Sequence, residues 1–203
     1  MGSLVLAIAV CVVALVLWRR RRYWKVAALQ PERLALLRRE SAALGLVPDG
    51  LGLMLEAPGG PTFLHVVDPR DLQDPEPYVA LDAPRAMSAF AYVDMVASTP
   101  DVPFELALYK RDLLMRQRGL ERSLSRRFRR TYYASANGPS SNAALAWLIA
   151  NEATLLRLRP SRVYVHRSGG PPPRVEIILD LSTLAPGHLG TSLELIAQSS
   201  KKL

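Results

Sequence analysis

Arginine side chains recur at short intervals between Arg116 and Tyr133, a stretch that holds seven arginines and one acid. Guanidinium groups bind phosphates and carboxylates, so this stretch is the first place to look for binding chemistry. On a helix, its leucines and Phe128 would share one side and most of its arginines the other. The candidate contacts with an anionic surface are Arg116, Arg118, Arg122, Arg126, Arg129 and Arg130.

The sequence leaves several interpretations of these arginines open. The first is a face that is solvated or that pairs with the chain's own acids, because ten acids and two arginines lie between Val47 and Glu105. An anionic membrane surface and a protein partner are the next alternatives. Aromatic residues interleave with the arginines, but no recognised nucleic-acid-binding module surrounds them. We therefore do not expect nucleic acid as a partner and keep it as an alternative only.

Residues that commonly catalyse reactions or bind metals lie apart in the sequence. His65, His166 and His188 have no second ligand at the spacing of metal motifs, and the single cysteine, Cys11, excludes an internal disulfide and a thiolate cluster. There is no phosphate-binding glycine loop and no dinucleotide fingerprint. The sequence predicts no catalytic residue, no cofactor and no metal. An enzyme whose site is assembled from distant residues remains an alternative.

Two polar segments contain residues that could form a binding or catalytic site, but a structural role explains each of them better. In "NGPSSNA", the serines lack the glycine of a nucleophile elbow and fit the cap of the following helix better, although the free amides there leave a weak phosphate candidate. In "DPRDLQDPEP", prolines interrupt the acids, and the glycine of a calcium loop is missing. A solvated acidic loop is favoured, with a docking surface for a basic partner as the alternative. Its acids are Asp68, Asp71, Asp74 and Glu76.

The first element along the chain is the uncharged run from Ser3 to Trp18. A helix of this length reaches about 24 Å, and the hydrocarbon core is about 30 Å thick. Local thinning and snorkelling arginines would cover the difference, so we expect a retained transmembrane helix. Its basic flank predicts an outside N-terminus and a cytoplasmic domain at the cell (inner) membrane. The expected flank is Trp18, Arg19, Arg20, Arg21, Arg22, Tyr23 and Trp24.

The remaining chain predicts one mixed α+β domain with mainly antiparallel strands. Period-two alternation is clearest in "FELALYK", where Phe104, Leu106 and Leu108 share one face. "RVYVHR" and "RVEIILDL" predict a hairpin, and "SSNAALAWLIANEATLLRLRP" predicts a helix. The predicted organisation is an anchor with a basic flank at 1–25, a juxtamembrane helix at 26–46, and a cytoplasmic α+β domain at 47–203.

One resemblance covers roughly Phe104 to Leu181. An aromatic strand after an arginine run, a leucine-rich helix ending "LLRL", then "VYVH", a turn and "VEIIL" together resemble a layout found in bacterial membrane-anchored proteins of uncharacterised function. The resemblance implies an anchored α+β domain and carries over no catalytic residue.

These features together favour a non-catalytic role: a membrane-anchored accessory, scaffold or interaction protein. The expected partners are the lipid bilayer and a protein partner or membrane complex. The first alternative is binding of anionic lipid or nucleic acid through 116–130, and the second is the enzyme with an unrecognised site.

Overall fold

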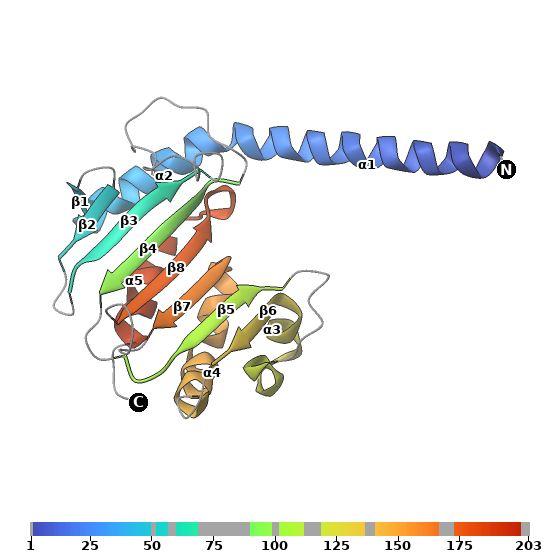
Figure 1. Cartoon of the computed structure of the whole chain (residues 1–203). Coiled ribbons are helices and arrows are strands. Elements are labelled where there is room, and N and C mark those ends of the chain that lie inside the picture. The colour runs from blue at the N-terminus through green and yellow to red at the C-terminus, as the bar shows by residue number, and fades with distance from the viewer. Residues whose placement is uncertain are drawn as a thin grey trace.

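The computed structural model describes residues 2–49, 52–56, 60–68, 90–98, 102–111, 119–136, 141–166 and 173–199. Its strands form one antiparallel sheet in the order β1-β2-β3-β4-β8-β7-β5-β6 (Figure 1). The strands are β1 (Val47–Asp49), β2 (Gly52–Leu55), β3 (Thr62–Val67), β4 (Tyr92–Ser98), β5 (Leu106–Lys110), β6 (Tyr132–Ser135), β7 (Arg162–His166) and β8 (Arg174–Asp180). The predicted α+β class with antiparallel strands is therefore found.

Alternation along the strands gives the sheet two different faces. In β4, for example, Val93, Met95 and Ala97 are buried while the residues between them are half-buried. Successive side chains of a strand point to opposite faces, so one face of the sheet is apolar and enters the core. The predicted inward set in β5 is confirmed, since Phe104, Leu106 and Leu108 are all buried.

The helices are α1 (Gly2–Ala28), α2 (Gln30–Ala43), α3 (Arg126–Thr131), α4 (Ser141–Leu158) and α5 (His188–Ser199), with short 3-10 turns η2 (Leu120–Ser123) and η4 (Leu181–Thr183). Of these, α2, α4 and α5 cover the apolar face of the sheet. In Figure 1, α4 and α5 lie behind the sheet. The helix residues Leu37, Trp147, Leu155 and Leu195 join the inward strand residues in one core. The main apolar core of the domain thus lies on one side of the sheet.

The predicted helix in the last third is found as α4. Its apolar residues are not all buried: Leu148 and Leu155 are buried, whereas Ile149 is 55 % exposed. The centre of the packed side is Trp147, whose ring lies 5.9 Å from that of Phe104. The position of the core relative to the helix, which the sequence does not contain, decides which of two overlapping apolar stripes is buried.

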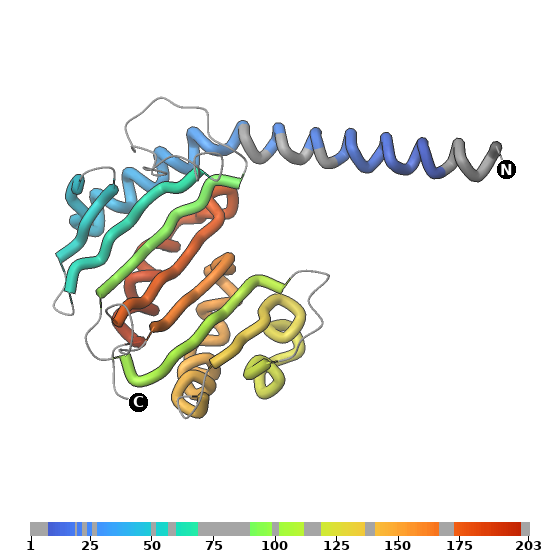
Figure 2. Tube along the Cα trace, in the orientation of Figure 1, coloured from blue at the N-terminus to red at the C-terminus, as the bar shows by residue number. Residues whose placement is uncertain are grey.

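The prediction of a transmembrane helix is not confirmed. The N-terminal run does form a helix, α1, which projects away from the sheet (Figure 2). However, no helix among the described residues carries an apolar stretch long enough to cross a bilayer. The physical reason is length, because Arg19 to Arg22 interrupt the apolar run before it reaches about 30 Å. The single-pass and signal-anchor interpretation is therefore wrong. The predicted location of the N-terminus and of the domain is not tested by this finding and stays a prediction.

The helix expected across the arginine stretch also differs where the structure describes it. Residues 112–118, with Arg116 and Arg118, lie outside the described residues. Beyond them the chain forms η2, a break at Leu124, and the six-residue α3. Gly119 lies so close to the carbonyl oxygen of Ala134 that an added Cβ would come within 1.9 Å. The chain turns here because this close approach to β6 replaces a continuous helix.

Candidate functional site

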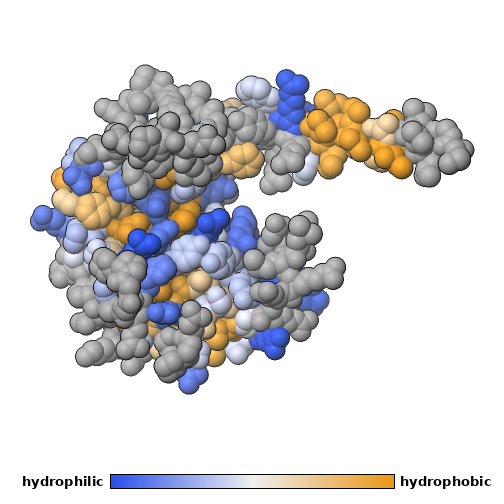
Figure 3. Space-filling model, viewed as in Figure 1, coloured by the Kyte–Doolittle hydropathy of each residue, from blue (hydrophilic) through white to orange (hydrophobic). Residues whose placement is uncertain are grey.

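The helix-free face of the sheet gathers polar and aromatic side chains. Cross-strand pairing sets His65 opposite Asp94, Tyr164 opposite Glu176, and Tyr109 opposite both Arg162 and Tyr133. Figure 3 views the molecule from this side, where hydrophilic and hydrophobic patches lie over the strands between the grey segments. We call this surface the helix-free face; its central members are Phe63, His65, Asp94, Tyr109, Tyr133, Arg162, Tyr164, His166, Arg174 and Glu176.

Three tyrosines form a cluster on the half of this face made by β5, β6 and β7. The ring of Tyr109 meets that of Tyr164 edge-on at 5.5 Å and stacks with that of Tyr133 at 6.5 Å. His166 stacks with Tyr164 at 5.7 Å, which extends the cluster along β7. Hydrogen bonding with Tyr164, followed by burial, raises the pKa of Tyr109 above its usual value. The rings are half-buried, so they combine a fixed position with accessible apolar surface.

The other half of the face carries charged groups at its centre. Burial, reinforced by the neighbouring carboxylate of Glu176, raises the pKa of Asp94 to about 7, while Arg174 opposes the shift. Burial lowers the pKa of His65, and its ring stacks with that of Phe63 at 6.4 Å. Arg174 approaches Glu176 at 3.8 Å. The Oδ1 atom of Asp94 is buried without a hydrogen-bond partner. This half is therefore a mixed-charge surface on which carboxyl groups lie beside an arginine and a histidine.

The arginine-rich segment is anchored by its one acid. Glu121 is 1 % exposed and accepts hydrogen bonds from the backbone N–H groups of Gly119 and Ala134 at 2.9 and 3.1 Å. It also forms a salt bridge with Arg111 at 2.9 Å. This buried carboxylate holds η2 against β5 and β6 and uses a cation from outside the predicted stretch. The sequence shows Glu121 only as the one acid among seven arginines. It does not reveal the role of this residue, because the partners of Glu121 are brought to it by tertiary folding.

The candidate arginines themselves lie on the outside of this segment. Arg122, Arg126, Arg129 and Arg130 are exposed, whereas Leu124 and Phe128 of the predicted apolar side are buried. Among the described residues, none of these four arginines forms an ion pair. Pairing with the chain's own acids therefore does not occupy them in the described part of the chain. Of the acidic loop, only Asp68 is described, and it is buried; Asp71, Asp74 and Glu76 lie outside the described residues.

A second basic group lies where β5 ends, α3 ends and α4 ends. Lys110, Arg127, Thr131, Leu156 and Arg159 line a hollow of about 130 Å³. Arg127 and Thr131 come from the arginine stretch, and Arg127 was not among the predicted contacts. The three cations are distant in sequence. The one weak sequence signal is the basic end of the predicted helix before Pro160, which points toward Arg159. We call this feature the basic hollow.

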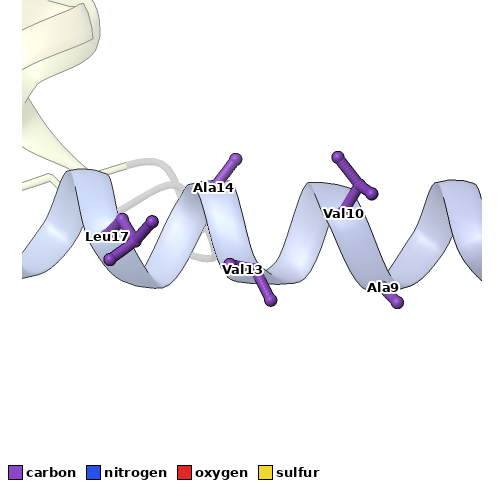
Figure 4. Close-up of a pocket in the computed structure, with 5 residues that line it drawn as sticks. All are labelled: Ala9, Val10, Val13, Ala14 and Leu17. Carbon is purple, nitrogen blue, oxygen red and sulfur yellow. The ribbon is translucent and has the colours of Figure 1, made fainter.

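The N-terminal helix α1 carries an exposed apolar surface. The side chains that form it project outward from this single helix (Figure 4) and do not enclose a pocket; they are Ala9, Val10, Val13, Ala14 and Leu17. Of the expected membrane flank, Trp18, Arg20, Arg21 and Trp24 are exposed, and the side chains of Arg19, Arg22 and Tyr23 lie outside the described residues. Their role as a flank depended on the spanning helix and remains untested.

The histidines occupy separate structural positions. His188 begins α5, where its Nδ1 accepts a hydrogen bond from the backbone of Ala185 at 3.3 Å, and burial lowers its pKa. His65 and His166 lie on opposite halves of the helix-free face. No group of three or more metal-ligating side chains is found in the part of the chain that the structure describes. Most of "NGPSSNA" lies outside the described residues.

Comparison with known proteins does not add a family to this geometry. No protein-family model, curated protein or solved structure is significantly similar to this chain.

Proposed function

We propose that the protein is a non-catalytic interaction protein that binds a protein partner on its helix-free face. The observation that carries the proposal is the cluster of Tyr109, Tyr133 and Tyr164 beside Arg162. Tyrosine and arginine are the residues that most often dominate the binding energy of protein interfaces, because they offer a large apolar body together with directional polar atoms.

The charges of the face favour a protein over a nucleic acid. Asp94, Glu176 and Asp180 all project from the same side of the sheet as the tyrosines. Carboxylates repel a phosphate backbone, whereas a protein surface can offer groups of both signs. The proposed partner therefore presents an apolar side chain to the tyrosine rings and a carboxylate to Arg162. It presents a basic or hydrogen-bond-donating group to the half that holds Asp94 and Glu176.

The role of the other face supports the same assignment. The apolar face is filled by α2, α4 and α5, so its side chains are already used in the core. The helix-free face contributes little to that core and still holds its aromatic side chains in fixed contacts. Side chains that are positioned before binding lose less entropy when a partner docks.

Affinity purification of the full-length protein from its native cells tests the proposal. We expect one partner to co-purify in fixed stoichiometry, and the double variant Tyr164→Ala/Arg162→Ala to lose it by at least tenfold. The matched control is Arg38→Ala, which removes an exposed arginine of α2 on the opposite side. Equal recovery with the double variant and the control, or a solitary wild-type protein, would contradict the proposal.

A further inference from the structure

The basic hollow brings three cations together around one small space. Lys110 ends β5, Arg127 lies in α3, and Arg159 follows the last residue of α4. Three separate segments therefore contribute one positive charge each. Thr131 adds a hydroxyl, but this hydroxyl already donates to the carbonyl oxygen of Arg127 at 2.9 Å. The available donors are thus the ammonium group and the two guanidinium groups.

None of these cations has a counter-charge in the described part of the chain. Lys110, Arg127 and Arg159 form no ion pair there, and all three are exposed. By contrast, Arg111, the residue that follows Lys110, forms a salt bridge with the buried Glu121. Like charges around one hollow repel one another, and an anion in the hollow would relieve that repulsion.

Arg159 adds an observation that is independent of charge. It is the one non-glycine residue with a positive φ, 53°, in the described chain. Glycine is the usual residue where a helix ends in this conformation, because other residues are strained there. The backbone of Arg159 is held by its N–H, which donates to Leu155 at 2.9 Å. The arginine side chain is therefore kept at a position where its backbone is disfavoured, a pattern that is typical of functional sites.

We propose that the basic hollow is a binding site for a phosphate monoester group. Its volume of about 130 Å³ is well above the minimum of about 10–15 Å³ that one water needs, so a small tetrahedral oxyanion can enter it. Two guanidinium forks and an ammonium group match the charge and the three terminal oxygens of a monoester dianion. A carboxylate or a phosphodiester offers fewer charged oxygens. The site is separate from the helix-free face, so its failure would leave the proposed protein partner unaffected.

Titration of the full-length protein with inorganic phosphate at low ionic strength tests the site. We expect phosphate to raise the melting temperature and to saturate, because a ligand that binds the folded state stabilises it. Sodium chloride at the same ionic strength is the control for screening. A melting temperature that responds equally to both salts would overturn the proposal.

Arg159→Gly is the most informative variant. Glycine relieves the backbone strain, so the variant should fold with an equal or higher melting temperature. At the same time, we expect its affinity for phosphate to fall at least tenfold. Arg38→Ala is the matched control, because Arg38 is an exposed arginine of α2 that does not line the hollow; it should stay within twofold of wild type. Retained affinity in Arg159→Gly, or an equal loss in the control, would contradict the site.

The phosphate monoester could belong to a soluble molecule or to a lipid headgroup, and vesicles separate the two. Binding to vesicles with phosphatidic acid, but not to vesicles with phosphatidylserine at equal charge, would support a lipid source. Binding of inorganic phosphate without vesicle binding would support a soluble source. Equal binding to both vesicles that Arg159→Gly leaves unchanged would overturn the proposal, since general attraction to negative charge would then explain it.

Discussion

The two faces of the eight-stranded sheet differ in almost every physical property. One face presents valine, leucine, isoleucine and methionine to α2, α4 and α5 and is buried in the core. The other presents tyrosine, histidine, arginine and carboxylates, together with Val96 and Ile178, and most of these side chains are half-buried or exposed. Both faces come from the same strands by simple alternation. Stability and binding can therefore be assigned to opposite faces of one sheet. Substitutions on the covered face should mainly lower stability, and substitutions on the helix-free face should mainly weaken binding.

The largest expected effect is on the core side. Trp147→Ala removes a fully buried ring that contacts Phe104, so we expect the free energy of unfolding to fall by about 3–5 kcal/mol. Chemical denaturation followed by circular dichroism measures this loss. A loss below about 1 kcal/mol would mean that the helix layer is not packed as described.

The buried carboxylate at the β6 edge of the sheet gives the next effect. Glu121→Ala leaves two backbone N–H groups without their acceptor and removes the salt bridge with Arg111, so we expect a loss of about 3 kcal/mol. Glu121→Gln keeps one acceptor oxygen and should lose less. The same denaturation experiment applies, and equal stability of the alanine variant and wild type would show that Glu121 does not hold η2.

A smaller effect, with a defined pH dependence, is expected at Asp94. Its pKa is raised to about 7, so between about pH 4 and pH 7 the folded protein keeps a proton that the unfolded chain has released. Stability therefore falls as pH rises through this window. We expect Asp94→Asn to be more stable than wild type by about 1–3 kcal/mol at pH 8, and the two to converge near pH 4. Parallel stability curves across this range would contradict the burial of Asp94.

The smallest effect on stability, but a large one on binding, is expected on the helix-free face. Tyr164→Ala removes contacts with Tyr109 and His166, so we expect a loss of about 1 kcal/mol in unfolding free energy. Partner recovery should nevertheless fall at least tenfold. If stability fell as far as it does in Trp147→Ala, the two faces would not have the separate roles that we assign to them.

Local pattern predicted much of the covered face. The alternation around Leu106 and Leu108 gave β5 and its inward side, and two extended runs with a turn between them gave the β7–β8 hairpin. These features depend on neighbouring residues alone. The placement of β8 between β4 and β7 depends on contacts distant in sequence, and no pattern in the chain contains it.

The candidate sites were harder to predict for the same reason. Arg159 and Lys110 are far apart in sequence and meet only because α4 ends beside β5. His65 and Asp94 become neighbours through the register of β3 with β4. The transmembrane prediction failed on a different point: local thinning and snorkelling were used to cover a shortfall in length, and the apolar stretch is too short.

Site-specific photo-crosslinking in native cells tests the central claim most directly. A benzophenone amino acid is placed at Tyr133 on the helix-free face, or at Ile149, which is 55 % exposed on the helix-covered side. We predict one discrete covalent adduct with a protein partner from position 133 and none from position 149. An adduct from position 149 alone, or adducts of equal yield from both positions, would contradict the assignment of binding to the helix-free face.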